Sequence, residues 1–166
     1  AGTAAAVTLG GALPTGEASA ETTATVALVR HAEAVGSDGR IQGPIVQAML
    51  DDAVGALFGT GDPGEAWRRL VAKSDVVGIK TNAWYRLPTP PEVEEAIKRR
   101  VTDAGVAEKN IGIDDRGVLD NPLFRNATAL INVRPLRTHH WAGVGTCLKN
   151  YIMFVPNPSG YHADGC

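Results

Sequence analysis

The chain has 166 residues, of which 44% are hydrophobic and 20% charged, and its formal net charge is -2. A chain of this length can form one domain with a substantial core, and its charge gives no reason to expect nucleic acid or an anionic membrane surface as a partner. The two cysteines, Cys147 and Cys166, are too few for a disulfide scaffold.

Residues 1–20 are predicted to be the remnant of an export signal. The weakly apolar run "AGTAAAVTLGGAL" is followed by the small-x-small cleavage pattern Ala18-Ser19-Ala20. The run is shorter than the roughly 20 apolar residues that span a bilayer, so no stable membrane span is expected after signal removal. The segment resembles a twin-arginine signal without its basic part, which implies an exported protein, periplasmic or at the cell surface. The alternative is an unstructured Ala-rich terminus.

Residues 21–166 are expected to form a single α/β domain. Short apolar runs rich in β-branched residues predict strands, and apolar residues at helical spacing between capping signals predict helices. This alternation is typical of βαβ units, so we expect a three-layer fold with a mainly parallel sheet. In chain order the predicted elements are strand Ala24–Val29, helix Ile45–Gly59, helix Asp62–Ala72, strand Asp75–Lys80, helix Pro90–Val106, strand Asn110–Asp115, strand Ala127–Val133 and helix Gly143–Phe154.

Polar side chains follow the predicted strands. Ligands of open α/β sheets bind outside the carboxyl ends of the strands, so these side chains, with the pair Arg30 and His31, are expected to converge on one edge. Each group taken alone could instead cap a turn or lie in a solvated loop. The predicted binding residues for a small anionic ligand are Lys80, Asn82, Asp114, Asp115, Arg116, Arg137, Thr138 and Asn150.

The segment "RTHHWAGVGTCLKN", residues 137–150, has the highest density of reactive side chains. In extended chain, His139 and His140 point to opposite faces, so one of them is expected to face a given site. Imidazole suits proton transfer, and a partly buried Lys149 could act as a nucleophile or covalent anchor. His139, His140 and Lys149 are therefore the predicted catalytic residues. The alternative is a core-flanking histidine pair with a surface lysine.

The same segment could contribute to a metal site. His139 and Cys147, with His162 and Cys166 near the C-terminus, could complete a His/Cys set for nickel, iron or zinc. Their spacing matches no zinc-finger or zinc-ribbon template. A transition metal or a metal-bearing organic cofactor is thus a second kind of ligand that the sequence allows.

The stretch "ALVRHAEA" resembles the strand-then-Arg-His signature of histidine phosphatases. That resemblance implies phosphoryl transfer at Arg30 and His31, although "GRIQGPIVQAML" reproduces the helix start that follows this signature poorly.

From Ala66 to Cys166 the chain resembles the bacterial and archaeal family known as domain of unknown function 362. The motifs are "VVGIKTN", "TPPEVEEAIKRRVTDAGV", "IGIDDR", "ALINVRPLRTHHWAGVGTCLKNYI" and "YHADGC". Arg137 stands where that family has lysine. Because its members are usually longer, the resemblance implies that this chain is the first half of a two-lobed fold, truncated at its C-terminus.

The element "HHWAGVGTCLK" is similar to a segment of the nickel-pincer lactate racemase family. The likeness implies an acid/base role for His139, a cofactor-tethering role for Lys149 and nickel ligation by His162. Thr146, Cys147 and Leu148 replace the Gly-Gly-Pro of that family.

The sequence thus predicts an exported α/β protein with a His/Lys cleft at the strand ends for a small anionic metabolite or a metal-bearing cofactor. A non-catalytic metal-binding, cofactor-binding or assembly subunit is the alternative, and a histidine phosphatase is a minor one. Whether the chain is an enzyme, and which oligomeric or redox partner it has, stays open at this level.

Overall fold

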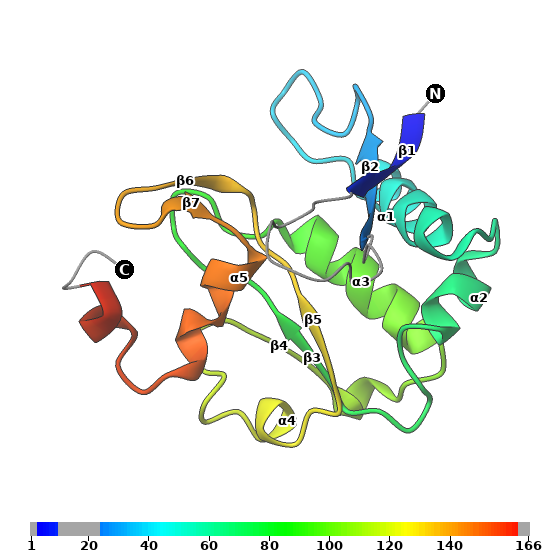
Figure 1. Ribbon diagram of the computed structural model, residues 1–166. Helices are drawn as coiled ribbons and strands as arrows, with labels where there is room; N and C mark the ends of the chain where they lie inside the picture. The colour runs from blue at the N-terminus through cyan, green and yellow to red at the C-terminus, as the bar shows by residue number, and fades with distance from the viewer. Residues whose placement is uncertain (1–2, 10–23, 163–166) are drawn as a thin grey trace, which may run out of the picture.

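The computed structural model describes residues 3–9 and 24–162 (Figure 1). Within these ranges the chain alternates strands and helices, and short 3-10 turns (η) follow near the end. In chain order the elements are β1 Thr3–Leu9, β2 Ala24–Arg30, α1 Gly43–Phe58, α2 Pro63–Arg68, β3 Val77–Lys80, α3 Pro91–Asp103, η1 Glu108–Asn110, β4 Ile111–Asp114, α4 Pro122–Arg125, β5 Ala129–Asn132, β6 Arg137–His139, β7 Gly143–Gly145, α5 Cys147–Asn150, η2 Tyr151–Phe154 and η3 Pro158–His162.

Three parallel strands in the order β4-β3-β5 form the central sheet, which confirms the predicted α/β fold. The central strand β3 is buried at all four positions, as predicted from its apolar residues 77–79, and Lys80 at its end is buried as well. In the register of the sheet, Lys80 lies opposite Asp114 on one side and Asn132 on the other. The carboxyl ends of the three strands therefore end level with one another.

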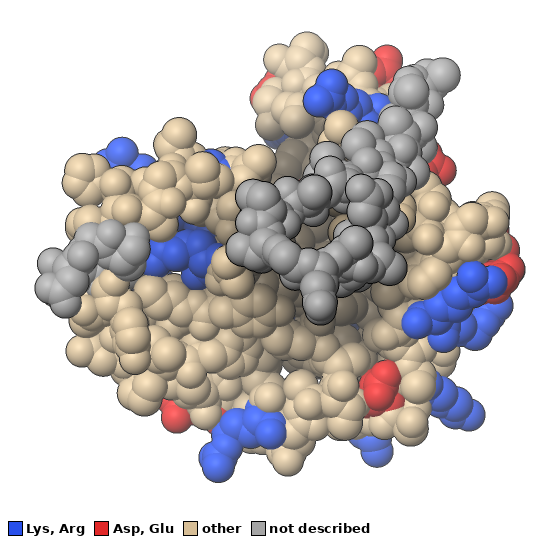
Figure 2. Space-filling model, in the orientation of Figure 1, with Lys and Arg blue, Asp and Glu red and all other residues tan. Residues whose placement is uncertain are grey.

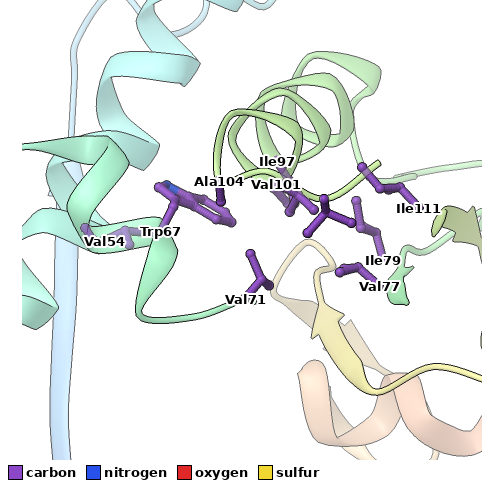
Figure 3. Close-up of a cluster of buried hydrophobic side chains, with 11 residues drawn as sticks. Val54, Trp67, Val71, Val77, Ile79, Ile97, Val101, Ala104 and Ile111 are labelled. Carbon is purple, nitrogen blue, oxygen red and sulfur yellow. The ribbon is translucent and has the colours of Figure 1, made fainter. Parts of the chain in front are cut away.

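Helices α1, α2 and α3 lie on one side of this sheet, with α1 and α2 packed against α3 (Figure 1). Val77 and Ile79 of β3 are fully buried there against Ile97 and Val101 of α3, and Trp67 of α2 closes the cluster (Figure 3). Burying side chains of this size contributes about 1.5–3 kcal/mol each. This cluster holds the sheet in place and so fixes the positions of the strand ends.

An ion pair ties α3 to α1. The guanidinium of Arg100 donates through Nε to Asp51 Oδ1 at 2.8 Å and through Nη2 to Asp51 Oδ2 at 2.6 Å. This bidentate contact raises the pKa of Arg100 above its ordinary value. Arg100 is thus a partly buried arginine whose hydrogen-bond acceptors are supplied by the protein itself.

The opposite face of the sheet carries the short helix α4, so the fold has three layers. A Cβ atom at Gly78 would lie 3.1 Å from Phe124, and one at Gly112 would lie 3.0 Å from Leu123. The helix can approach the sheet this closely because both strand positions are glycine. Phe154 of η2 packs on Phe124 with ring centroids 6.3 Å apart, which brings the end of the described chain onto the same face.

The first strand differs from the prediction in its partner and in its burial. Residues 24–30 form β2, but β2 pairs antiparallel with β1 in a separate two-stranded sheet and is largely exposed. The prediction of a buried strand of the parallel sheet was wrong here, because an apolar run specifies a strand but not its neighbour. The strand β1 lies inside the segment predicted to be an export signal, and the cleavage pattern at residues 18–20 lies outside the described residues. The signal and the domain boundary stay predictions.

The predicted helix Gly143–Phe154 was wrong in its first part. Residues 143–145 form β7, which pairs antiparallel with β6 across a short loop. Gly143 has φ = 67°, a left-handed conformation that suits the residue after a three-residue hairpin loop. Helix α5 begins only at Cys147, after Thr146 as N-cap.

Over the ranges that the structure covers, no helix combines the length and the apolar character needed to cross a membrane.

Candidate functional site

The site is built on the level carboxyl ends of the parallel sheet. Beyond β5 the chain runs through Arg134 into the β6–β7 hairpin, and α5 then returns to the strand ends. Asn150 of α5 makes this return contact, because its Nδ2 donates to Asn132 Oδ1 at 2.8 Å and to the carbonyl of Thr81 at 3.0 Å. Two segments that lie about 70 positions apart in the sequence are thereby joined over the sheet edge.

Lys80 is the buried centre of this edge. Its side chain is fully buried, and Nζ donates to the carboxylate of Asp115, to the carbonyl of Thr81 at 2.7 Å and to Asn150 Oδ1 at 3.2 Å. Burial lowers the pKa of Lys80, and the carboxylate of Asp115 opposes that effect. All three hydrogens of the ammonium group have acceptors within the protein. Lys80 therefore lies beneath the site as part of a satisfied polar network.

Asp115 and Asn82 complete the network. The second carboxylate oxygen of Asp115 accepts the backbone N–H of Ala83 at 2.7 Å, and Asn82 Nδ2 lies 3.5 Å from Asn150 Oδ1. The hydroxyl of the following strand-end residue, Thr81, donates to Glu94 of α3. These contacts hold the loop after β3 rigidly against the loop after β4.

A pocket of about 190 Å³ opens above this network. It contains one carboxylate, that of Asp115, and four basic side chains, which come from the loops after β4 and β5, from β6 and from α5. Figure 2 shows basic side chains gathered in a hollow of this face, beside α5. The residues that line the pocket are Asn82, Trp84, Asp115, Arg116, Arg134, Arg137, His139, Lys149, Asn150, Ile152 and Met153.

Arg134 and Arg137 are the two arginines that carry unsatisfied buried groups. The Nε atom of each is buried and has no hydrogen-bond partner among the described residues. Burial lowers the pKa of Arg134, and the positive charge of Arg137 lowers it further. Two guanidinium groups are thus held close together although they repel each other, and neither Nε–H finds an acceptor.

Local packing keeps both guanidinium groups in place. The guanidinium carbon of Arg137 lies 3.9 Å from the centre of the Trp84 ring, a cation–π contact. Arg134 lies against Gly145, where a Cβ atom would come within 3.1 Å of its Nη2. Asn82 Oδ1 is a further buried atom that lacks a partner in the described chain. The pocket therefore presents preorganised hydrogen-bonding groups.

His139 and Lys149, two of the predicted catalytic residues, line this same pocket. His139 is half-buried, and its Nδ1 accepts the backbone N–H of Ala142 at 3.2 Å, so the neutral imidazole carries its proton on Nε2. His140 is exposed and does not contribute to the lining, as the opposite faces of an extended strand require.

Other predicted residues lie away from the lining. Asp114 accepts the N–H of Gly117 at 2.9 Å and the side-chain amide of Asn121 at 3.1 Å, so it stabilises the turn after β4. Thr138 is exposed on β6. Whether either contributes to binding stays a prediction, but the structure does not bring them to the pocket.

The predicted metal ligands are only partly covered. Cys147 is exposed, and its Sγ donates to the carbonyl of Asn132 at 3.6 Å. Cys166 and the side chain of His162 lie outside the described residues. Within the described part of the chain, no three His, Cys, Asp or Glu side chains are grouped as a metal ion would require.

Arg30 and His31 are not part of this edge. Arg30 ends β2 in the separate hairpin sheet, and His31 follows it, with Nδ1 accepting the N–H of Glu33 at 3.1 Å. The expected convergence with the other strand ends was wrong for this pair, because β2 does not belong to the parallel sheet. Phosphoryl transfer at this pair stays a prediction.

The sequence analysis missed Arg134 and Trp84. Arg134 is the second residue after β5, so collecting every polar residue beyond that strand would have included it. Trp84 could not be found in this way, since only the packed structure places its ring under Arg137.

Comparison of the chain with protein-family models, with curated proteins and with solved structures found no match. The family resemblances noted in the sequence therefore stay predictions.

Proposed function

We propose that this chain binds a small anionic molecule in the pocket above the Lys80 network. The observation that carries the proposal is the pair of buried Nε–H groups of Arg134 and Arg137 that have no acceptor among the described residues. An unsatisfied buried donor costs about 1–3 kcal/mol, so a fold that keeps two of them side by side gains stability when an oxyanion enters.

The chemistry of the lining specifies the charge of the ligand. Arg116 and Lys149 add two cations to the arginine pair, whereas Asp115 is already neutralised by Lys80. Guanidinium groups bind the planar fork of a carboxylate or the oxygens of a phosphate through charge-assisted hydrogen bonds. Asn82 Oδ1 can in addition accept a hydrogen bond from a hydroxyl group of the ligand. A phosphate, a phosphate ester or a small hydroxy acid meets these requirements.

A metal-bearing cofactor fits the described residues less well. Asp115 is the one carboxylate of the lining, and both of its oxygens are engaged with Lys80 and Ala83. His139 is the predicted metal ligand that lines this pocket, and His162, the nickel ligand that the lactate racemase likeness implies, has no described side chain.

Proton transfer to or from the bound anion is a second candidate function. His139 shares the pocket with the cations, and its neutral form, with the proton on Nε2, can donate that proton to the bound anion as a general acid. The test is incubation of the protein with a 2-hydroxy acid such as lactate in D2O. Deuterium at carbon 2, read by proton NMR and lost in His139→Gln, would support catalysis, whereas binding without exchange would leave a binding protein.

Isothermal titration calorimetry tests the proposal. Inorganic phosphate and citrate are titrated separately into the protein in a low-salt buffer free of both anions, which distinguishes a phosphate site from a carboxylate site. We expect saturable binding of at least one anion and an affinity at least about tenfold lower in Arg134→Gln and in Arg137→Gln.

The matched control is Arg125→Gln, which removes an exposed arginine of α4 that does not line the pocket. Equal loss of affinity in this variant would indicate a general charge effect and would contradict the proposal. So would wild-type protein that binds neither anion.

A further inference from the structure

A second hollow lies directly beside the cationic pocket. Its volume is about 570 Å³, and apart from Lys149 and Thr146 its lining is apolar. The residues that line it are Ala142, Val144, Thr146, Leu148, Lys149, Ile152, Val155 and Tyr161.

The apolar side chains of this hollow are unusually open to solvent. Leu148 is 81% exposed, Tyr161 59% and Val144 50%. Apolar residues that gather around a concavity on a protein surface mark a binding site, whereas single exposed ones need no explanation. These three residues come from β7, α5 and η3, so the concavity is assembled by the fold and does not belong to a single element.

The two cavities share part of their walls. Lys149 and Ile152 line both the cationic pocket and the apolar hollow. The stem of Lys149 can therefore lie along an apolar group while its ammonium group faces the anion, as long basic side chains commonly do. A single ligand can contact both cavities across these two residues.

The two cavity volumes indicate which part of such a ligand each cavity can hold. About 190 Å³ accommodates one anionic head group, whereas about 570 Å³ lies within the range of sites that hold an organic molecule. We propose that the ligand of this protein is amphiphilic, with an anionic head bound by Arg134 and Arg137 and an apolar body in the hollow formed by Val144, Leu148 and Tyr161. This inference rests on the proposed anion-binding function and specifies its ligand class.

Paired probes that differ only in their apolar part test the inference. Methyl phosphate is compared with n-hexyl phosphate, and acetate with heptanoate, by calorimetry below the micellar concentration of each probe. We expect the longer member of the pair with the preferred head group to bind at least about tenfold more tightly, because its added methylenes leave water. The pair that shows this gain also distinguishes a phosphate ester from a carboxylate.

A double variant locates the apolar body. Val144→Thr with Leu148→Gln keeps the charge of the site and changes side chains that are half or more exposed, so the fold is preserved. We expect this variant to bind the short and long probes with affinities within about threefold of each other. The control is Leu136→Gln, a similarly exposed leucine (75%) outside both linings, which should keep the full gain.

The outcomes separate this inference from the proposed function. Equal affinities for short and long probes in wild-type protein, with binding still dependent on Arg134, would overturn the amphiphilic ligand and leave the anion site intact. Tight binding of n-hexyl phosphate that Arg134→Gln does not weaken would also overturn it, since the head group would then lie elsewhere. Absence of binding by all four probes would overturn the amphiphilic ligand, and the anion site would fall with it if inorganic phosphate and citrate also failed to bind.

Discussion

Two groups of basic side chains lie at the same edge of the sheet, and they differ in whether the protein itself supplies acceptors for their hydrogen bonds. Lys80 is fully buried and donates all of its hydrogens to Asp115, Thr81 and Asn150. Arg134 and Arg137 are partly buried, carry the same sign of charge and leave their Nε atoms without partners in the described chain. The difference teaches that burial of a charge alone does not indicate a binding site. Buried hydrogen-bond donors without acceptors in the described chain do indicate one.

The comparison predicts opposite effects on stability for the two groups. Removing a satisfied buried cation leaves its acceptors unpaired and so lowers the stability of the protein. Removing one of two cations that repel each other takes away an unfavourable interaction, which in the wild-type protein a bound anion would offset. We expect the change in the free energy of unfolding to be largest for Lys80→Ala and smallest for Asp75→Asn.

Lys80→Ala should cause the largest loss of stability. The carboxylate of Asp115 would stay buried without its partner, so we expect the free energy of unfolding to fall by about 3–5 kcal/mol. Urea denaturation followed by circular dichroism measures this loss. The double variant Lys80→Met with Asp115→Asn removes both charges and should recover part of it. A loss below about 1 kcal/mol in Lys80→Ala would show that the pair does not hold the sheet edge.

Asn150→Ala should come next, because this one side chain joins α5 to the ends of both β3 and β5. Its loss leaves Asn132 Oδ1 without this donor and Lys80 Nζ without one of its three acceptors, and we expect the free energy of unfolding to fall by roughly 2–3 kcal/mol. The same denaturation experiment applies, with Asn157→Ala as the control at an exposed asparagine. Equal stabilities of the two variants would refute a clamping role for Asn150.

Arg134→Gln should have the opposite sign. Without the repulsion from Arg137 and without a buried unsatisfied Nε–H, the free energy of unfolding in anion-free buffer should stay unchanged or rise by up to about 1 kcal/mol. Added phosphate or citrate should then raise the melting temperature of wild-type protein but not that of the variant. A variant less stable than wild type by more than about 1 kcal/mol would assign Arg134 to the structure and not to binding.

Asp75, just before β3 at the other end of the sheet, should give the smallest effect. Its carboxylate accepts the N–H of Ala72 at 2.6 Å and the hydroxyl of Thr128 at 2.8 Å, and the first of these bonds is the larger cause of its lowered pKa. A carboxyl group whose folded-state pKa lies below the ordinary value of 3.8 contributes stability above that value and loses it as the pH falls further.

Denaturation at pH values between 2 and 6 measures this term. Asp75→Asn should flatten the decline of stability below about pH 4 and change little above it except for a small constant loss. If the decline in the variant matched that of wild type, the acid sensitivity would have to come from other carboxyl groups, those around the pocket included.

The elements that sequence analysis predicted best are those with local signals. Helix α3 was expected at Pro90–Val106 and runs over Pro91–Asp103, because proline at its start, acids in its first turn and Gly105 after its end all act locally. The strand β2 was predicted as a strand but in the wrong sheet, since pairing is decided by distant residues. The helix expected from Gly143 failed because the turn required by Gly143 outweighs the apolar pattern that follows it.

The position of the site could be predicted from the sequence, but the role of each residue in it could not. Strand ends in a parallel sheet directed attention to Lys80, Asp115 and the segment from residue 137 to 150. Which cation is satisfied depends on contacts such as the one between Lys80 and Asn150, which are 70 positions apart in the sequence. No local pattern distinguishes a lysine whose hydrogens are all used from an arginine whose Nε lacks an acceptor.

NMR of the arginine side-chain Nε–H groups tests the central claim most directly, because it observes the unsatisfied donors themselves. Selective variants assign the signals of Arg134, Arg137 and Arg100, and inorganic phosphate or citrate is then titrated in. The signals of Arg134 and Arg137 should shift together in a saturable manner, while that of Arg100, whose Nε already donates to Asp51 at 2.8 Å, should stay in place. If all three signals were to remain unchanged, or to drift equally with the salt concentration, the pocket would not be an anion site.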